Sequence, residues 1–324
     1  MINPISELLG QIEPAGEKDT VLITCASFEE RSAAVAQRLA RNYVTEHTFI
    51  FRSTEYGDMG ESPRYFRLIE DKMTSVSINK PTVVNFSIDH SIPSMAQFEA
   101  YYRELNSTSL VRNVSVDITT FPRQELLMLL RVLGSQSDHL SIRLFYGEPL
   151  RYCTEDPGGW LTRGVKSVRP VPGFGGVQPP NKKKNLLIMF LGHEDERAAI
   201  TWKRHQPRKT IAIVPDPSYR KEMNGIVERT HQPLFTKLSP TEFYPAVPAR
   251  GIEESENAVL RIWEEHHESY YVVVAPLGTK LQTLGIYRAV RQRPDIQITY
   301  AIPSIYNYEN YSVGVNRIWQ IHWT

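Results

Sequence analysis

Short apolar runs alternate with amphipathic segments along almost the whole chain, and this alternation limits the folds that it can adopt. The runs of the first half have the length and composition of buried strands, at residues 20–26, 47–52, 82–87, 113–119 and 139–145. Between them lie segments with apolar residues at helical spacing, at 33–43, 63–73, 94–105 and 122–133. Such an order predicts an α/β domain with a mainly parallel sheet. Two less regular stretches are expected to form a leading helix at 5–12 and a short strand at 231–237.

The alternation stops in a segment rich in Gly and Pro and then starts again. We therefore expect a first Rossmann-like domain at residues 1–150, an inter-domain arm at 151–184, and a second Rossmann-like domain at 185–324 with an aromatic C-terminal tail. Within the arm, residues 160–171 partly alternate between apolar and polar side chains. They are expected to be a strand or an extended segment that crosses between the halves.

Three landmarks recur in the same order in the two halves, which predicts a duplicated Rossmann-like unit. SFEERSAA matches HEDERAAI, VDITTFPRQELLMLLRVL matches VVAPLGTKLQTLGIYRAV, and LFYGEPLRY matches TYAIPSIYNY. The first match aligns Ser27 with His193, Glu30 with Glu196 and Arg31 with Arg197. Open α/β sheets bind ligands beyond the carboxyl ends of their strands, where these loops are expected. Halves related by a pseudo-twofold axis would bring the loops to one shared cleft.

The stretch at 270–290 holds the most specific turn of the chain. A buried strand is followed by Pro-Leu-Gly-Thr-Lys and then by an amphipathic helix, so Gly278, Thr279 and Lys280 are expected at a helix N-terminus. Backbone N–H groups and a cation at such a place favour phosphates and other anions. The alternative is an ordinary strand–helix turn with an exposed lysine. The upstream glycine of a Walker loop is missing.

The first half has a related turn, in which Thr119, Thr120 and Arg123 offer hydroxyls and a guanidinium for a phosphate or a ribose. The alternative there is that Thr120 caps the helix that follows Pro122. At the other landmark, Ser27 and Glu30 are expected to form a capping box.

Charged residues of both signs follow the first strand of each half. We expect Arg31 and Arg197 to bind either an acidic residue of the other half or a ligand phosphate. The candidates for catalysis are Glu30, Glu196 and His193, although a lone histidine at a strand end is more often structural. Neither a metal-ligand spacing nor a nucleophile motif is present in the sequence, so we expect no metal and no cofactor.

The composition excludes several classes of protein. A formal net charge of +1 gives no general attraction to double-stranded nucleic acid or to a membrane surface. Two cysteines, Cys25 and Cys153, are too few for a disulfide framework. With neither a signal peptide nor a long apolar run in the sequence, we expect a cytoplasmic location.

The turn at 276–280 resembles the strand–GGTK–helix signature of the CARF (CRISPR-associated Rossmann fold) domains. VDITTFPRQELLMLL is a degenerate counterpart, and a tandem pair in one chain is similar to SAVED domains. The resemblance implies a role in prokaryotic immunity and recognition of a cyclic oligonucleotide or related nucleotide between the halves. It covers Gly278, Thr279 and Lys280, with Thr119 and Thr120 as the weaker copy. Leu277 replaces one glycine of the signature.

Three functions follow from these observations. The first is a nucleotide-sensing module of an anti-phage defence system that passes a signal to a partner protein. The second is a nucleotide-processing hydrolase, of the phosphodiesterase or glycosidase type. The third is a non-enzymatic adaptor that binds another protein through its aromatic tail and Gly/Pro-rich arm.

Overall fold

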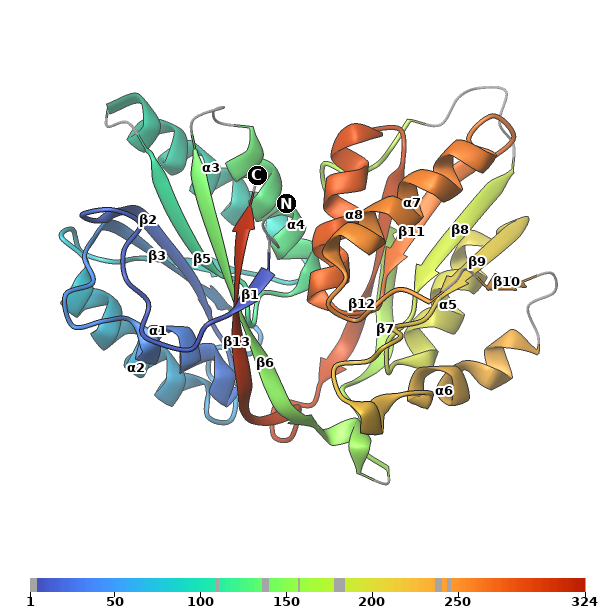
Figure 1. The fold of residues 1–324 in the computed structure, drawn as a ribbon, viewed down its shortest axis with the longest axis horizontal. Helices are drawn as coiled ribbons and strands as arrows, with labels where there is room; N and C mark the ends of the chain where they lie inside the picture. Colours follow the sequence, from blue (N-terminus) through green and yellow to red (C-terminus); the bar gives the residue numbers. More distant parts are fainter. Residues whose placement is uncertain are drawn as a thin grey trace. The chain divides into compact units, whose positions relative to one another are not determined.

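The computed structural model describes residues 5–108, 111–135, 140–156, 158–177, 184–236, 241–243 and 246–323. The chain forms two compact units. Unit 1 consists of Met1–Cys153 and Asn307–Thr324, and unit 2 of Thr154–Tyr306. Each unit holds one mostly parallel sheet whose strands alternate with helices (Figure 1), which confirms the expected Rossmann-like α/β class.

The sheet of unit 1 has the strand order β1-β13-β6-β5-β2-β3-β4. Five neighbouring strands are parallel, whereas β13 pairs antiparallel with β6, and β1 pairs antiparallel with β13. The strands are β1 (Ile5–Glu7), β2 (Asp19–Ala26), β3 (Thr45–Ser53), β4 (Thr82–Phe86), β5 (Asn113–Asp117), β6 (Ser141–Tyr152) and β13 (Ser312–Trp323).

Helices cover both faces of this sheet, so its central strands are buried on both sides (Figure 1). On one face, Leu22 and Ile50 pack in a core with Ile69 of α2. On the other face, Phe49 and Phe51 make edge-on contacts with Phe98 of α3, at ring-centroid distances of 5.0 and 5.3 Å. The helical segments are η1 (Glu30–Ala33), α1 (Ala34–Arg38), α2 (Ser62–Val76), α3 (Ser91–Thr108) and α4 (Arg123–Gly134).

The sheet of unit 2 has the order β10-β9-β8-β11-β12-β7. Again five neighbouring strands are parallel, and β7 pairs antiparallel with β12. The strands are β7 (Thr162–Pro170), β8 (Asn185–Phe190), β9 (Lys209–Ile213), β10 (Thr241–Phe243), β11 (Tyr271–Pro276) and β12 (Gln297–Tyr306).

One face of this second sheet packs against α5 and α6 through a core that includes Leu187, Ala198 and Val227. The helices α7 and α8 lie on the other face (Figure 1). These two approach each other closely at Gly285, where an added Cβ would lie 2.1 Å from the main-chain oxygen of Ile252. The helical segments are η2 (Cys153–Glu155), η3 (Lys221–Met223), α5 (Asp195–His205), α6 (Ile226–Phe235), α7 (Ile252–His266) and α8 (Lys280–Gln292). None of the helices in the described ranges is long and apolar enough to span a membrane.

The expected domain limits need two corrections. The aromatic tail does not belong to the second domain, because β13 adds to β6 of unit 1 along the register Ser312↔Tyr152 to Trp323↔Ile142. The Gly/Pro-rich arm is not a separate element either. It contains β7, which is a strand of the second sheet and confirms the strand expected at 160–171.

Two local expectations were wrong. The leading segment forms the strand β1 and no helix, because it pairs with β13, which comes from the far end of the chain. Most of the strand expected at 231–237 falls in α6, and residue 237 lies outside the described ranges. Pro233 lies inside α6, near its C-terminal end.

The two sheets share one strand order. In each, five parallel strands lie side by side, and an antiparallel strand pairs with the last of them in the chain, which is β6 in unit 1 and β12 in unit 2. This shared order agrees with the expected repeat. The duplication itself and the pseudo-twofold relation stay predictions.

Candidate functional site

Arg31 follows β2 at the carboxyl end of the first sheet and is only 2% exposed. Its Nε donates to Oε2 of Glu29 at 2.7 Å, its Nη2 donates to Oε1 of the same carboxylate at 3.2 Å, and its Nη1 donates to the main-chain oxygen of Gly147 at 3.0 Å. Burial alone would lower the pKa of Arg31, but the charge of Glu29, together with Tyr152, Tyr146 and the hydrogen bond to Glu29, raises the pKa well above its ordinary value. The guanidinium is therefore a permanent, internally paired cation.

Arg197 occupies the corresponding place in unit 2 and is also 2% exposed. Its Nη1 donates to Oε2 of Glu194 at 2.7 Å, and its Nε and Nη2 donate to the main-chain oxygen of Ala301 at 3.1 and 2.7 Å. Burial would lower the pKa of Arg197, but the charge of Glu194, together with Tyr300, Tyr306 and the hydrogen bond to Glu194, raises the pKa. Both arginines thus bind an acidic residue of their own unit, which corrects the expectation of a partner in the other half.

The same carboxylates also hold the antiparallel strand of each unit. In unit 1 the Ser312 hydroxyl, at the start of β13, donates to Oε2 of Glu29 at 2.5 Å. In unit 2 the Thr162 hydroxyl, at the start of β7, donates to Oε1 of Glu194. Each hydroxyl therefore joins the carboxylate that pairs with the buried arginine to the first residue of the antiparallel strand, β13 in unit 1 and β7 in unit 2.

A second carboxylate in each unit accepts a hydrogen bond from a glycine of the same strand. Gly314 N–H donates to Oε2 of Glu30 at 3.2 Å, and Gly164 N–H donates to Oε2 of Glu196 at 2.8 Å. Both glycines have left-handed backbone angles, with φ of +61° and +65°. Glu30 and Glu196, the candidates for catalysis, are thus acceptors for main-chain groups.

We call these two groups latch 1 (Glu29, Glu30, Arg31, Ser312, Gly314) and latch 2 (Glu194, Glu196, Arg197, Thr162, Gly164). The sequence comparison found the two arginines and the second carboxylates, but it missed the residues on the strands. The signal for them is a Ser/Thr-x-Gly triplet at the start of β13 and of β7.

The capping box expected at Ser27 is absent. The short helical turn η1 begins at Glu30 with Glu29 as its N-cap and with no side-chain cap, and Ser27 contributes its main-chain oxygen to the Ser32 hydroxyl at 3.3 Å. The physical reason is that the Glu30 carboxylate is engaged by Gly314 and does not turn back to the loop.

The hydroxyls expected to bind ligand in the first half make contacts within the chain. Thr119 is buried, and its Oγ1 accepts the Gly147 N–H at 2.9 Å. The Thr120 hydroxyl donates to the main-chain oxygen of Cys25 at 2.6 Å, so it joins the loop after β5 to β2. It does not cap α4, whose N-cap is Pro122.

The Gly-Thr-Lys turn of unit 2 is a helix cap. Thr279 and Gln282 form a complete capping box, with Gln282 N–H donating to the Thr279 hydroxyl oxygen at 3.1 Å and Thr279 N–H donating to Oε1 of Gln282 at 3.0 Å. The Thr279 hydroxyl donates in turn to the Ala249 oxygen at 2.6 Å. At Gly278 an added Cβ would lie 2.3 Å from Oε1 of Gln282, so a larger residue there would displace the Gln282 side chain of the capping box.

Two predicted residues remain partly exposed at equivalent positions. Arg123 is the first residue of α4, Lys280 is the first residue of α8, and each helix follows the fourth parallel strand of its sheet. A helix N-terminus carries a partial positive charge, so cations are disfavoured there and anions are favoured. Both residues therefore lie where an anion would be favoured.

His193 lies in the loop after β8 and is partly buried. Burial lowers its pKa, although Glu194 and Glu155 act in the opposite direction. His231 of α6 is fully buried, and its Nε2 lies 2.8 Å from the main-chain oxygen of Gly192. Burial also lowers the pKa of His231, so both imidazoles are neutral near pH 7.

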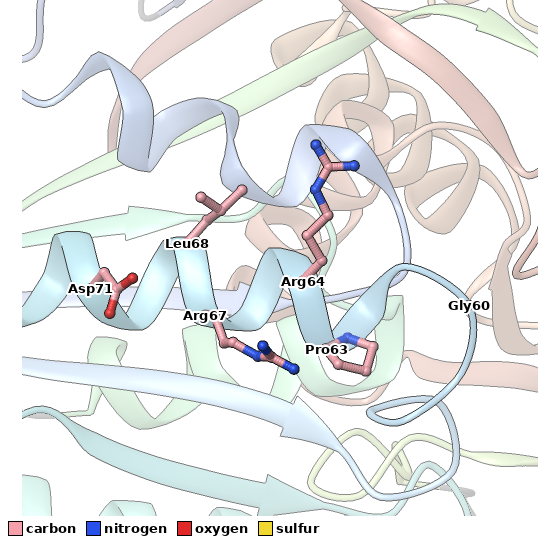
Figure 2. Close-up of a pocket in the computed structure, with 6 residues that line it drawn as sticks. All are labelled: Gly60, Pro63, Arg64, Arg67, Leu68 and Asp71. Atoms are coloured by element: carbon pink, nitrogen blue, oxygen red, sulfur yellow. The ribbon is translucent and has the colours of Figure 1, made fainter.

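A hollow of about 360 Å³ lies along the N-terminal half of α2 (Figure 2). Arg64 and Arg67 lie on opposite sides of the helix face that borders it, and Arg64 is paired with Glu61 at 2.9 Å. The remaining lining residues are Gly60, Pro63, Leu68 and Asp71. None of the predicted site residues lines this hollow. Within the described ranges there is also no group of three or more His, Cys, Asp or Glu placed to hold a metal ion.

Comparisons with known proteins give a likeness in structure but none in sequence family. No family model matches the chain, and no curated protein matches it. Among solved structures, the chain is similar to the cytoplasmic domain of a prokaryotic cation chloride cotransporter. The identity is 9%, the match covers 89% of this chain and 96% of that chain, and the TM-score is 0.28. A likeness at that TM-score supports no conclusion about function.

Proposed function

We propose that this chain is a nucleotide-sensing module of a prokaryotic defence system, which binds a nucleotide or cyclic oligonucleotide and signals to a partner protein. The observation that carries the proposal is the placement of Arg123 and Lys280. Each is a partly exposed cation at the first residue of a helix, at the carboxyl end of a parallel sheet. Phosphate groups are the anions that such sites bind most often.

The electrostatics of a helix N-terminus favour an anion at these positions. A charge near a helix end changes stability by about 0.3–1 kcal/mol, and a cation at the N-terminus has the unfavourable sign. A bound phosphate reverses that sign, because it interacts favourably with both the helix and the side chain. In unit 1 the start of α4 has no side-chain cap, whereas α8 is capped by Thr279 and Gln282. We therefore propose α4 as the stronger of the two phosphate sites.

The hydrolase alternative has less support. Glu30 and Glu196 accept hydrogen bonds from Gly314 and Gly164, so each carboxylate already holds a strand. Arg31 and Arg197 are buried in ion pairs and are not presented to a transition state. A general base would then have to come from His193, whose pKa is lowered by burial.

The adaptor alternative loses its binding element. The aromatic tail was expected to bind another protein, but it forms β13 and pairs along its length with β6. Deleting it would remove a strand from the sheet of unit 1, which would destabilise the unit whether or not a partner exists.

The matched latches favour descent of the two units from one duplicated sequence. Arg31 binds the oxygen of Gly147, and Arg197 binds the oxygen of Ala301. These two acceptors are equivalent in the aligned segments LFYGEPLRY and TYAIPSIYNY. We therefore include duplication in the proposal.

A thermal-shift screen of the full chain against mono-, di- and cyclic oligonucleotides tests the function. A ligand at 100 times its dissociation constant adds about 2.7 kcal/mol of stability. We expect a shift that is lost in Arg123→Gln and weakened in Lys280→Gln. The matched controls are Arg131→Gln and Arg291→Gln, which change a cation in the last turn of the same helices and should keep the shift.

Product analysis of each hit separates the sensor from the hydrolase. Recovery of intact ligand after long incubation agrees with a sensor. Turnover of the ligand would favour the hydrolase alternative instead. The absence of a shift across the whole panel, or an equal loss in the variants and their controls, would contradict nucleotide binding at these helices.

A further inference from the structure

The chain passes between the units twice, and the ends of both crossings lie at the two latches. β6 ends in unit 1 at Tyr152, and the next strand, β7, begins in unit 2 at Thr162. β12 ends in unit 2 at Tyr306, and β13 begins in unit 1 at Ser312. Each sheet is thus completed by a strand that directly follows the fifth parallel strand of the other sheet.

The start of each crossing lies beside the arginine of its own unit. The guanidinium of Arg31 lies 5.8 Å from the ring centroid of Tyr152, and Tyr152 contributes to the raised pKa of Arg31 after the larger effects of burial and Glu29. In unit 2, Tyr306 is the register partner of Thr162, and the Thr162 hydroxyl donates to Glu194, the carboxylate that accepts from Arg197.

The end of each crossing is bound by the carboxylate of the unit that it enters. Ser312 donates to Glu29, and Thr162 donates to Glu194. The sheet registers agree, because Ser312 is the partner of Tyr152, and Thr162 is the partner of Tyr306. Both crossings, at 153–161 and 307–311, therefore begin at one latch and end at the other.

We propose that the two latches are coupled through these crossings, so that opening one latch loosens the other. Releasing Ser312 from Glu29 frees the end of the segment that begins at Tyr306, beside Arg197. Releasing Thr162 from Glu194 frees the end of the segment that begins at Tyr152, beside Arg31. The latches also contain the loops that follow the first strand of each sheet, so the coupling links the ligand-facing edges of the two units. This inference goes beyond the proposed function, because it holds whichever ligand the units bind.

Amide hydrogen exchange of the full, ligand-free chain tests the coupling. The variants are Ser312→Ala and Thr162→Val, each of which removes one hydroxyl and leaves the buried ion pair in place. The reporters are peptides over residues 28–33 and 193–198. A hydrogen bond to a charged group corresponds to roughly a ten- to hundredfold change in local opening.

We expect exchange to rise by about tenfold or more in the latch that carries the substitution, and by a smaller but clear factor in the other latch. Ser312→Thr keeps the hydroxyl and should restore slow exchange in both reporters. The control is Thr299→Val, which removes a buried hydroxyl from β12 whose partners are His205 and the main-chain oxygen of Arg169. An increase confined to the substituted unit, or an equal response to Thr299→Val, would overturn the coupling. Ligand binding can fail without affecting this result, so the two proposals are tested separately.

Discussion

Replacing Arg31 by methionine tests whether that arginine is a structural residue or a ligand-binding one. Methionine keeps much of the apolar length of the side chain but removes the guanidinium. The substitution breaks two hydrogen bonds to Glu29, at 2.7 and 3.2 Å, and one to Gly147, at 3.0 Å. It leaves the Glu29 carboxylate, whose side chain is 6% exposed, without the guanidinium that balances its charge.

The magnitude follows from that burial. Removing one partner of a buried ion pair costs about 3–5 kcal/mol, because the remaining charge has lost its compensation. We expect a loss of this size in the free energy of unfolding, measured by urea denaturation of the full chain at pH 7. The control is Arg103→Met, since Arg103 pairs with Glu99 on the surface of α3 and is 63% exposed. Pairs of that kind contribute about 0.3–0.5 kcal/mol.

A second variant separates the ion pair from general disruption. Glu29→Gln combined with Arg31→Met removes both charges, so it should recover part of the stability lost in Arg31→Met alone. If Arg31→Met lost no more stability than Arg103→Met, the buried pair would be refuted, and Arg31 would again be available to a ligand phosphate.

Three further predictions concern packing, capping and pH. Gly285→Ala should lower the free energy of unfolding by about 1–3 kcal/mol or more, because its Cβ would lie 2.1 Å from the Ile252 oxygen, and urea denaturation measures the loss. Gly278→Ala and Gln282→Ala should each cost about 1 kcal/mol in the same assay, and the double variant should cost less than their sum because both break one capping box. Burial lowers the pKa of His231 in the folded state, so unfolding takes up a proton and stability should fall as pH drops below about 6.5. His231→Gln should flatten that part of a melting-temperature profile, and an unchanged slope would contradict it.

The sequence pattern was enough to predict the parallel core of each unit. Apolar runs such as residues 20–26 and 113–119 correspond to β2 and β5, which are buried along almost their whole length. Periodicity captures these elements because a central parallel strand must be apolar on both sides. It does not predict which strands pair at a distance, so it could not assign β13 to β6 or β1 to β13.

The candidate site was predicted less well, because the residues that form it have different spacings in the two units. Glu29 lies two residues before Arg31, whereas Glu194 lies three residues before Arg197, so alignment of the two loops hides the common ion pair. Their strand partners lie far away in the sequence. The Gly-Thr-Lys turn was interpreted as a phosphate loop, but Gln282 completes a capping box with Thr279 there. The sequence pattern alone did not reveal this contact between the two side chains and the helix backbone.

Hydrogen exchange of the full chain, with and without the cyclic oligonucleotide or nucleotide that stabilises it most, tests the central claim most directly. The account predicts slower exchange at the starts of α4 and α8, at residues 119–125 and 278–283, with the larger effect in the first segment. The effect should disappear in Arg123→Gln and persist in Arg131→Gln. Protection confined to other segments, such as the hollow along α2, would contradict ligand binding at the helix N-termini.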